Sequence, residues 1–257
     1  MLLAFDIGNT NIKTGLFENG VLQHSFRLSV DRTRTADEYG IQVESFFHHL
    51  HLSPSIIDSI IISSVVPPLN YTIAHMCAMY FSDIDPMFVH AGLRTDLLFS
   101  YENPQTLGPD RICNSVAAMR LYGGNSITID FGTATTFNVL RGNRFLGGMI
   151  CPGFKVSSNA LIESTAMLPK VEFVNPGDAI GANTEHCIQS GLFFGYVGQV
   201  EYLVDLAKKA LGESATVIAT GGMVELILTQ TTCIDIINPM LTLAGLGAIY
   251  ELNNHNE

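Results

Sequence analysis

The sequence predicts an α/β protein built from two related lobes that face each other across a cleft. The first observation is a hairpin that occurs twice: an apolar strand ends in Asp6 or Asp130, and a short turn with a glycine and a threonine leads into a second strand. The second is the order of elements, because each half reads as strands followed by helix and strand, without a glycine- or proline-rich linker. Similarity over about 25 residues indicates a duplication. We therefore expect lobes at residues 1–118 and 119–257.

The first half begins with a three-stranded meander. We expect strands over residues 2–6, 11–17 and 21–29, a helix over 33–52, a strand within 55–68 and a helix over 68–82. Thr35 and Glu38 predict a capping box at the start of the first helix. A further helix is expected after Asp110, running to about Tyr122 and closed by glycines 123 and 124.

The second half repeats this plan. Within "SITIDFGTATTFNVLRGNRFLGGMI" we expect a strand ending at Asp130, a strand ending at Leu140 and a third strand after the turn "RGN". "PGFKVSSNALIESTAMLP" predicts a loop and a helix ending near Leu168. A long helix starting at Thr184, the strand "ATVIATGG" and the apolar segment "LTLAGLGAIYELN" follow.

Composition indicates a folded globular protein. Hydrophobic residues make up 47% of the chain and charged residues 14%, and the mean hydropathy is +0.28. The formal net charge of −11 would repel a polyanion, and the lysines and arginines are scattered. We therefore expect no nucleic-acid partner, whereas a small anionic ligand stays compatible with the sequence, because a few local cations or backbone N–H groups can hold one.

The sequence also argues against a membrane span, a disulfide framework and a zinc site. No window reaches the roughly 18 apolar residues of a span, and "MLLAFDIGN" lacks the features of a secretion leader. The five cysteines are widely spaced and form no C-x-x-C pair. We expect a cytoplasmic protein with reduced, mostly buried thiols.

The repeated hairpins predict a phosphate site. A Walker A loop is absent, and "GLG" at 245–247 lacks the third glycine of a dinucleotide fingerprint. Another way to bind phosphate uses a carboxylate that holds a metal-bound water, a glycine that leaves the backbone accessible, and hydroxyl or amide donors. Asp6, Gly8, Asn9 and Thr10 supply these groups here. Lys13 would add a point charge. Either turn alone could be purely structural, since Asp, Asn and Gly are turn formers, but the duplication favours a two-sided clamp.

The segment "GPDR" adds the acceptor side. Asp110 is either the N-cap of its helix or the base for a substrate hydroxyl, with Arg111 meeting an anionic group, and the two interpretations are compatible. The helix dipole keeps such a carboxylate ionised and weakly basic, yet phosphoryl transfer depends more on positioning than on basicity.

Taken together, "DIGNTNIKTGLF", "GPDR", "DFGTATTFNV", "GGMICPGFKVSSNALIESTAMLPKV", "IGANTEHCIQSGLFFGYVGQVE" and "VIATGG" resemble type III pantothenate kinases, within the superfamily of sugar kinases, actin and heat-shock ATPases. The resemblance implies two duplicated actin-like (ribonuclease H-like) α/β lobes around a nucleotide cleft. It also implies ATP-dependent phosphorylation of the primary hydroxyl of pantothenate, the first step toward coenzyme A. The family works as a cytoplasmic homodimer with ATP, Mg²⁺ and a monovalent cation such as K⁺ or NH₄⁺.

By this similarity each site residue receives a role. Asp130 binds the monovalent cation, Asp6 serves the metal and phosphates, and Asp110 is the proton acceptor. ATP contacts are implied for Asp6, Ile7, Gly8, Asn9, Thr10, Asn11, Ile12, Lys13 and Thr133, and pantothenate contacts for Tyr101, Gly108, Pro109, Asp110, Arg111 and Thr184. The family motif often has alanine where this chain has Pro109, and we expect no loss of activity because proline leaves the next position intact.

Alternatives remain at this stage. Thr184 is also a plausible N-cap, and the segment 152–169 either shapes a loop or lies beside the substrate or a dimer interface. A non-catalytic transcription accessory or interaction protein on the same fold is a second hypothesis, and a phosphohydrolase of the superfamily is a third. The acidic charge and the intact aspartates favour the kinase over the accessory protein.

Overall fold

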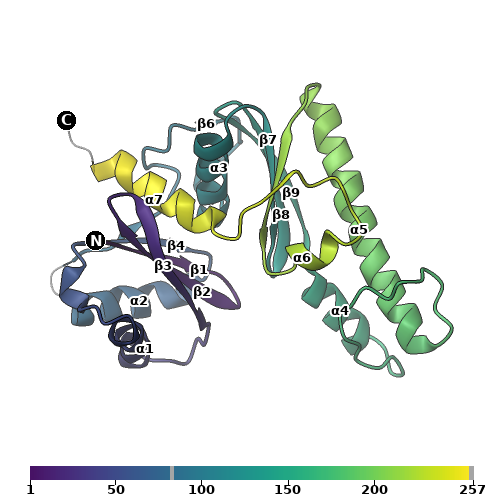
Figure 1. Cartoon of the computed structure of the whole chain (residues 1–257), viewed down its shortest axis with the longest axis horizontal. Coiled ribbons are helices and arrows are strands. Elements are labelled where there is room, and N and C mark those ends of the chain that lie inside the picture. Colours follow the sequence, from purple (N-terminus) through teal and green to yellow (C-terminus); the bar gives the residue numbers. More distant parts are fainter. Residues whose placement is uncertain (82–83, 255–257) are drawn as a thin grey trace. The chain divides into compact units, whose positions relative to one another are not determined.

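The computed structural model describes residues 1–81 and 84–254, which divide into two compact units (Figure 1). The first unit contains residues 1–97, 102–120 and those from 240 onward, and the second contains residues 98–101 and 121–239. The lobe boundary that we predict between residues 118 and 119 stays a prediction. The predicted second lobe ends at residue 257, and residues 255–257 lie outside the described part. The C-terminal helix packs with the first unit, because its apolar side contacts strands of that unit.

The first unit has a five-stranded sheet in the order β3-β2-β1-β4-β5. β1 is antiparallel to β2 and parallel to β4. Its strands are β1 (Leu2–Ile7), β2 (Asn11–Glu18), β3 (Val21–Ser29), β4 (Ser59–Ser64) and β5 (Met87–Phe88). Its helices are α1 (Ala36–His49), α2 (Pro67–Tyr80), α3 (Pro109–Tyr122) and α7 (Leu241–Asn254), with short 3₁₀ turns at Pro54–Ile56 and Pro104–Thr106.

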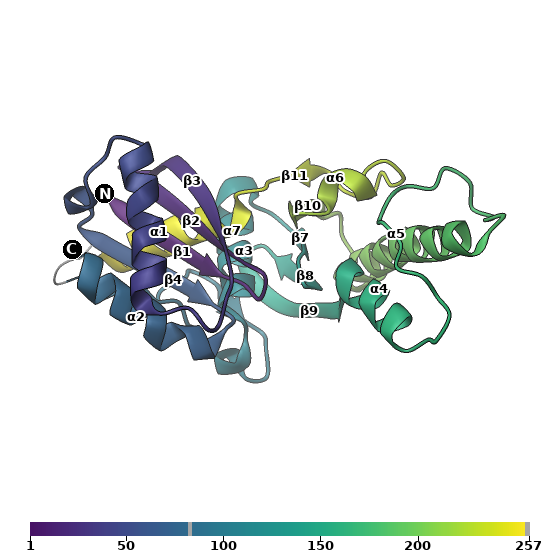
Figure 2. The ribbon, with the colours of Figure 1, turned by 90° about the horizontal axis from the view of Figure 1, so that it is seen from below.

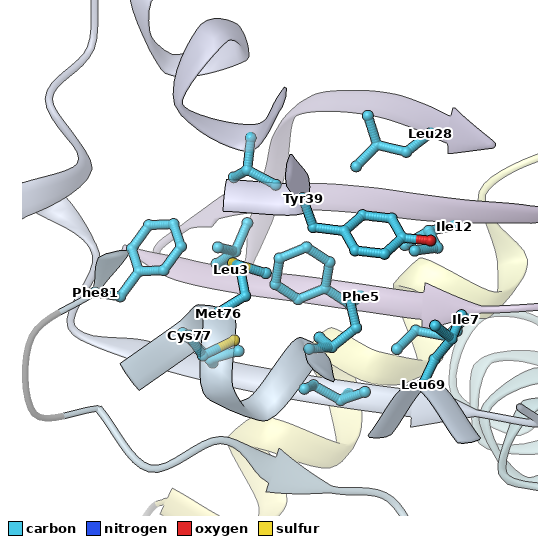
Figure 3. Packing of buried hydrophobic residues seen from close by; sticks show 14 of the residues in the cluster. Leu3, Phe5, Ile7, Ile12, Leu28, Tyr39, Leu69, Met76, Cys77 and Phe81 are labelled. Atoms are coloured by element: carbon cyan, nitrogen blue, oxygen red, sulfur yellow. The ribbon is translucent and has the colours of Figure 1, made fainter. Parts of the chain in front are cut away.

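Side-chain alternation along β1 decides which helices cover which face of this sheet. Leu3, Phe5 and Ile7 are fully buried and pack against Tyr39 of α1 and Leu69 of α2 (Figure 3). α7 contacts β1, β2 and β4 and lies on the other side of the sheet from α1 and α2 (Figure 2). The site aspartate at position 6 therefore points to the face opposite the α1–α2 core.

The second unit has a six-stranded sheet in the order β11-β10-β7-β8-β9-β6. Its strands are β6 (Leu98–Phe99), β7 (Ser126–Phe131), β8 (Ala134–Arg141), β9 (Arg144–Pro152), β10 (Thr216–Gly221) and β11 (Ile236–Ile237). Its helices are α4 (Phe154–Glu163), α5 (Thr184–Leu211) and α6 (Val224–Ile227). The core joins alternate residues of β7 to the apolar face of α5: Ile127, Ile129, Phe131, Val197, Val200 and Val204.

The two sheets confirm the predicted duplication. The order β3-β2-β1-β4-β5 recurs as β9-β8-β7-β10-β11, with the same parallel and antiparallel pairs. Even the register shift of the second hairpin recurs, between Leu16 and Phe17 in one copy and between Val139 and Leu140 in the other. Asp6 and Asp130 thus occupy equivalent places, one residue before the end of equivalent strands.

Two predicted N-caps were wrong, although the expected start of the long helix at Thr184 is confirmed. α3 begins at Pro109, a residue favoured in the first helical position, so Asp110 lies inside the first turn and is not the N-cap. α5 is capped by Asn183, whose Oδ1 accepts from the N–H of His186 at 2.9 Å, so Thr184 is the first helical residue. The capping box of Thr35 and Glu38 is confirmed.

Two helix ends also differ from expectation. α4 ends at Glu163, five residues before the expected Leu168, and Ser164 is its C-cap. The strand expected within 55–68 is confirmed as β4, which follows the 3₁₀ turn. α2 ends at Tyr80, and residue 82, the last of its predicted span, lies outside the described residues.

Candidate phosphate and acceptor site

The turn after β1 is short and bares its backbone. The N–H of Gly8 donates to the carbonyl oxygen of Asn11 at 3.0 Å, and the N–H of Val30 donates to the carbonyl of Thr10 at 3.0 Å. A Cβ at Gly8 would lie 3.3 Å from the Asn11 carbonyl oxygen, so a larger residue would crowd the turn. Asn9 is exposed in this turn. The geometry suits an anion that approaches bare peptide groups.

Arg32 is a cation that the sequence analysis missed. Its guanidinium donates to Oδ1 of Asn9 at 3.4 Å, which places a positive charge beside the turn. Residue 32 lies after β3, outside the predicted motifs, and the pairing of Asn11 with Ser29 and the backbone bond between Val30 and Thr10 bring this segment to the turn. A tertiary contact of this kind leaves no local pattern in the sequence.

Asp6 lies between two polar side chains on neighbouring strands. In the strand register it pairs with Lys13 on β2 and with Ser63 on β4, and side chains in register share a face of the sheet. Asp6 is only 9% exposed, and the hydroxyl of Ser63 donates to its Oδ1 at 3.3 Å. Lys13 is half-buried. A carboxylate with a lysine beside it can serve a metal-bound phosphate without accumulating net negative charge.

The segment 108–111 forms the start of α3 in the same unit. The Oδ1 of Asp110 accepts from the N–H of Arg111 at 2.8 Å, and a Cβ at Gly108 would lie 2.5 Å from this oxygen. A larger residue at position 108 would therefore displace the carboxylate of Asp110. Arg111 is 6% exposed and its charge is held largely out of solvent. Asp110 lies in the positive first turn of α3, which favours its ionised form.

Asp6 and Asp110 both lie near the thiol of Cys113. Burial raises the pKa of the Cys113 thiol well above its usual value, and the charges of Asp6 and Asp110 raise it further. Both carboxylates therefore lie close enough to this buried thiol to act on it electrostatically. The first unit alone thus combines the phosphate turn with the predicted proton acceptor.

The second hairpin has its own contacts in the second unit. The N–H of Gly132 donates to the carbonyl of Ala134 at 3.2 Å, and the N–H of Gly153 donates to the carbonyl of Thr133 at 3.0 Å. A Cβ at Gly153 would overlap the carbonyl oxygens of Gly132 and Thr133. The "PG" segment before α4 therefore supports the turn after Asp130, which is a structural role.

Asp130 has different neighbours from Asp6. In register beside it are Thr136 on β8 and Thr220 on β10, where the first unit has Lys13 and Ser63. The hydroxyl oxygens of Thr136 and Thr220 are buried and have no hydrogen-bond partner among the described residues. A carboxylate flanked by two unpartnered hydroxyl oxygens is a donor set that suits a hard cation.

The remaining predicted substrate residues belong to the second unit. Tyr101 makes an edge-to-face contact with Phe145, with ring centroids 5.8 Å apart, and Thr184 is exposed at the start of α5. The predicted pantothenate residues are thus divided, with 108–111 in the first unit and these two in the second.

Other candidate sites are less developed within the described residues. No cluster of three or more His, Cys, Asp and Glu side chains could hold a metal there. No helix in that part of the chain is long and apolar enough to cross a membrane. A hollow of about 340 Å³ at the Met1 end of β1 is lined by Glu18, Asp58 and Glu251, among others, and contains none of the predicted site residues.

Comparisons with solved structures confirm the fold class. A Sinorhizobium meliloti protein provisionally named a 2-dehydro-3-deoxygalactonokinase superposes with a TM-score of 0.63, at 13% identity over 100% of this chain and 98% of that one. A Campylobacter jejuni protein provisionally named a Baf family transcriptional activator gives 0.62, at 19% identity over 99% and 100% of the two chains. The Clostridium difficile activator of 2-hydroxyisocaproyl-CoA dehydratase, solved with bound ADPNP, gives 0.52, at 14% identity over 97% and 93%.

The family itself is shown by sequence. The family model described as type III pantothenate kinase matches residues 2–206, which include both hairpins, the segment 108–111 and most of α5. The kinase fold of the structural neighbours agrees with that match. This chain therefore belongs to the type III pantothenate kinase family.

Proposed function

We propose that this protein transfers the γ-phosphoryl group of Mg·ATP to the primary hydroxyl of pantothenate, the first step toward coenzyme A. The observation that carries the proposal is the grouping of Asp6, Asp110 and Cys113 within one unit, in a chain that belongs to this family. It supports one carboxylate that serves the metal and phosphates, and a second carboxylate nearby that serves as the proton acceptor. Phosphoryl transfer through a loose transition state needs this kind of positioning more than a strong base.

Each residue has a distinct part in this proposal. The turn 8–11 and Lys13 bind the phosphates, joined by Thr133, and Asp6 orients metal-bound water. Asp110 accepts the proton of the substrate hydroxyl. Arg111, with Tyr101 and Thr184, binds pantothenate. Bound Mg²⁺ supplies positive charge for the phosphate oxygens. The enzyme would work in the cytoplasm, where thiols such as the chain's five unpaired cysteines stay reduced.

A coupled assay of ADP release, with and without pantothenate, tests the proposal. We expect ADP release that depends on pantothenate and stops when Mg²⁺ is chelated. Release at the same rate without an acceptor would instead identify a phosphohydrolase. No release under either condition would favour an accessory protein, the role suggested by the name of the Campylobacter jejuni protein.

The donor set around Asp130 supports a monovalent cation such as K⁺ or NH₄⁺. Replacing these ions with tetramethylammonium is expected to abolish most turnover, because that ion cannot accept oxygen ligands. Asp130→Asn should remove the dependence together with most activity. Thermal unfolding gives a second readout: K⁺ should raise the melting temperature of the wild type and leave that of Asp130→Asn unchanged. Equal activity in both salts would contradict a cation at Asp130.

One face of α5 supports a homodimer. Gly191, Gly195 and Gly198 follow one another along this face, and a Cβ at any of them would meet nothing within 4 Å. Each glycine inside a helix costs about 1 kcal/mol relative to alanine. Tyr202 continues the face and is 63% exposed. Packing of this face against its two-fold copy would explain the small residues and would cover the tyrosine.

Gly195→Arg is expected to convert the homodimer to a monomer in size-exclusion chromatography with light scattering. Arginine favours the helix more than glycine does, so the substitution blocks close approach without weakening α5. Ala210→Arg is the matched control, because residue 210 is exposed on another side of the same helix. A Gly195→Arg protein with the same mass as the wild type would exclude this face as the interface.

A further inference from the structure

Ser63 is a buried polar residue to which the family resemblance assigns no role. It lies on β4 in register with Asp6, its exposed fraction is 0%, and its hydroxyl donates to Oδ1 of Asp6 at 3.3 Å. The distance is long for a bond between oxygens, but the acceptor is an ionised carboxylate in a buried setting, where orientation by charge is strong. Ser63 therefore biases which way the Asp6 carboxylate faces.

The neighbouring serine shows that this role is specific to one position. The hydroxyl of Ser64 donates to Oδ1 of Asn70 at 2.5 Å and accepts from the N–H of Val66 at 3.2 Å. Those bonds stabilise the turn from β4 into α2 and do not involve Asp6. The pair of adjacent serines thus contains one residue with a structural contact and one that contacts the site.

Cys113 is a buried neighbour of Ser63. Burial raises the pKa of its thiol well above the usual value, which keeps the thiol neutral, and Ser63 is near enough to lower this pKa in part. Cys113 follows Asp110 by three residues on α3, so the two side chains share a face of this helix. Ser63 therefore bonds the carboxylate of Asp6 and lies near the helix that carries Asp110.

The duplicated unit repeats this hydroxyl. Thr220 on β10 has the same register relation to Asp130 that Ser63 has to Asp6. The other neighbour is not repeated, since Lys13 corresponds to Thr136. A hydroxyl thus lies beside both aspartates, but only the hydroxyl of Ser63 donates to its carboxylate, since that of Thr220 has no hydrogen-bond partner among the described residues.

We propose that Ser63 is a positioning residue, which orients the Asp6 carboxylate for metal-bound phosphate. The inference rests on the proposed function, because it assigns Ser63 to the Mg·ATP side of that reaction. Residues that orient the ligands of a metal typically change its affinity or the activity by about 10- to 100-fold when they are replaced.

Ser63→Ala is expected to weaken Mg·ATP binding about tenfold and to move the midpoint of the Mg²⁺ dependence upward, with the KM for pantothenate unchanged. Ser63→Thr, the residue of the second copy, should restore both values. Ser64→Ala is the matched control and should lower the melting temperature without changing the Mg·ATP affinity or the midpoint of the Mg²⁺ dependence. Isothermal titration with Mg·ATP measures binding without turnover. It therefore still measures the effect of replacing Ser63 if pantothenate proves not to be the substrate.

A double-mutant cycle tests the coupling of Ser63 to its neighbour Cys113 and covers the case of a poorly folding Ser63→Ala protein. Cys113→Ala should shift the Mg²⁺ midpoint in the same direction, and the effects of the two substitutions should not add. Cys77→Ala removes another buried thiol, far from Asp6 in the α2 core, and should not shift the midpoint. Wild-type Mg·ATP affinity in Ser63→Ala, or equal shifts in Ser64→Ala and Cys77→Ala, would overturn the proposal.

Discussion

Asp110→Asn is expected to lower kcat for pantothenate phosphorylation by about 10²- to 10⁴-fold, the range for loss of a positioned general base. Asparagine keeps the size of the side chain and an oxygen that can accept from the N–H of Arg111, so the first turn of α3 stays intact. The variant loses only the ability to take up the hydroxyl proton. Steady-state kinetics with isothermal titration of Mg·ATP separates the lost turnover from the retained nucleotide binding.

Two results would contradict this assignment. Unchanged turnover in Asp110→Asn would mean that Asp110 is not the proton acceptor. Turnover and Mg·ATP affinity that fall together would assign Asp110 to the nucleotide side. Asp37→Asn, in the first turn of α1, is the matched control, since it removes one charge from the same unit and lies in neither hairpin.

Asp6→Asn has the opposite expected signature. The substitution removes the negative charge that faces metal-bound phosphate and leaves Lys13 beside a neutral amide. We expect Mg·ATP affinity to fall about 10- to 100-fold, with a higher Mg²⁺ requirement, while the KM for pantothenate changes little. Titration of activity against Mg²⁺ at fixed ATP gives the midpoint. An Asp6→Asn protein with the wild-type midpoint would show that Asp6 has no part in handling the metal.

Much of the fold could be predicted because the information is local. The strand before Asp6, the tight turn with Gly8 and the capping box of Thr35 each rest on neighbouring residues. The repeat around Asp130 then predicted a second sheet like the first, since the same order of strands and turns gives the same topology. The last helix is a different case: its apolar residues predict burial but do not say which sheet it covers, and it packs on the first.

The site residues that sequence analysis missed are those brought in by pairing between distant strands. Ser63 is 57 residues from Asp6, and only the parallel register of β1 and β4 makes them neighbours. Arg32 reaches Asn9 through the backbone contact between β3 and the turn. Asp110 and Thr184 were predicted as N-caps, but Asp110 is the second residue of α3 and Thr184 the first of α5, because Pro109 and Asn183 compete as helix starters. Tertiary packing decides which of these residues begins the helix.

Transfer of labelled phosphate from γ-labelled ATP to pantothenate is the most direct test of the proposed reaction, with wild-type protein and Asp110→Asn compared at saturating Mg·ATP and K⁺. We predict that the wild type yields pantothenate labelled on its primary hydroxyl and that Asp110→Asn, with nucleotide still bound, yields almost none. Label found only as inorganic phosphate, or no transfer by wild-type protein that binds Mg·ATP, would contradict a pantothenate kinase with Asp110 as its proton acceptor.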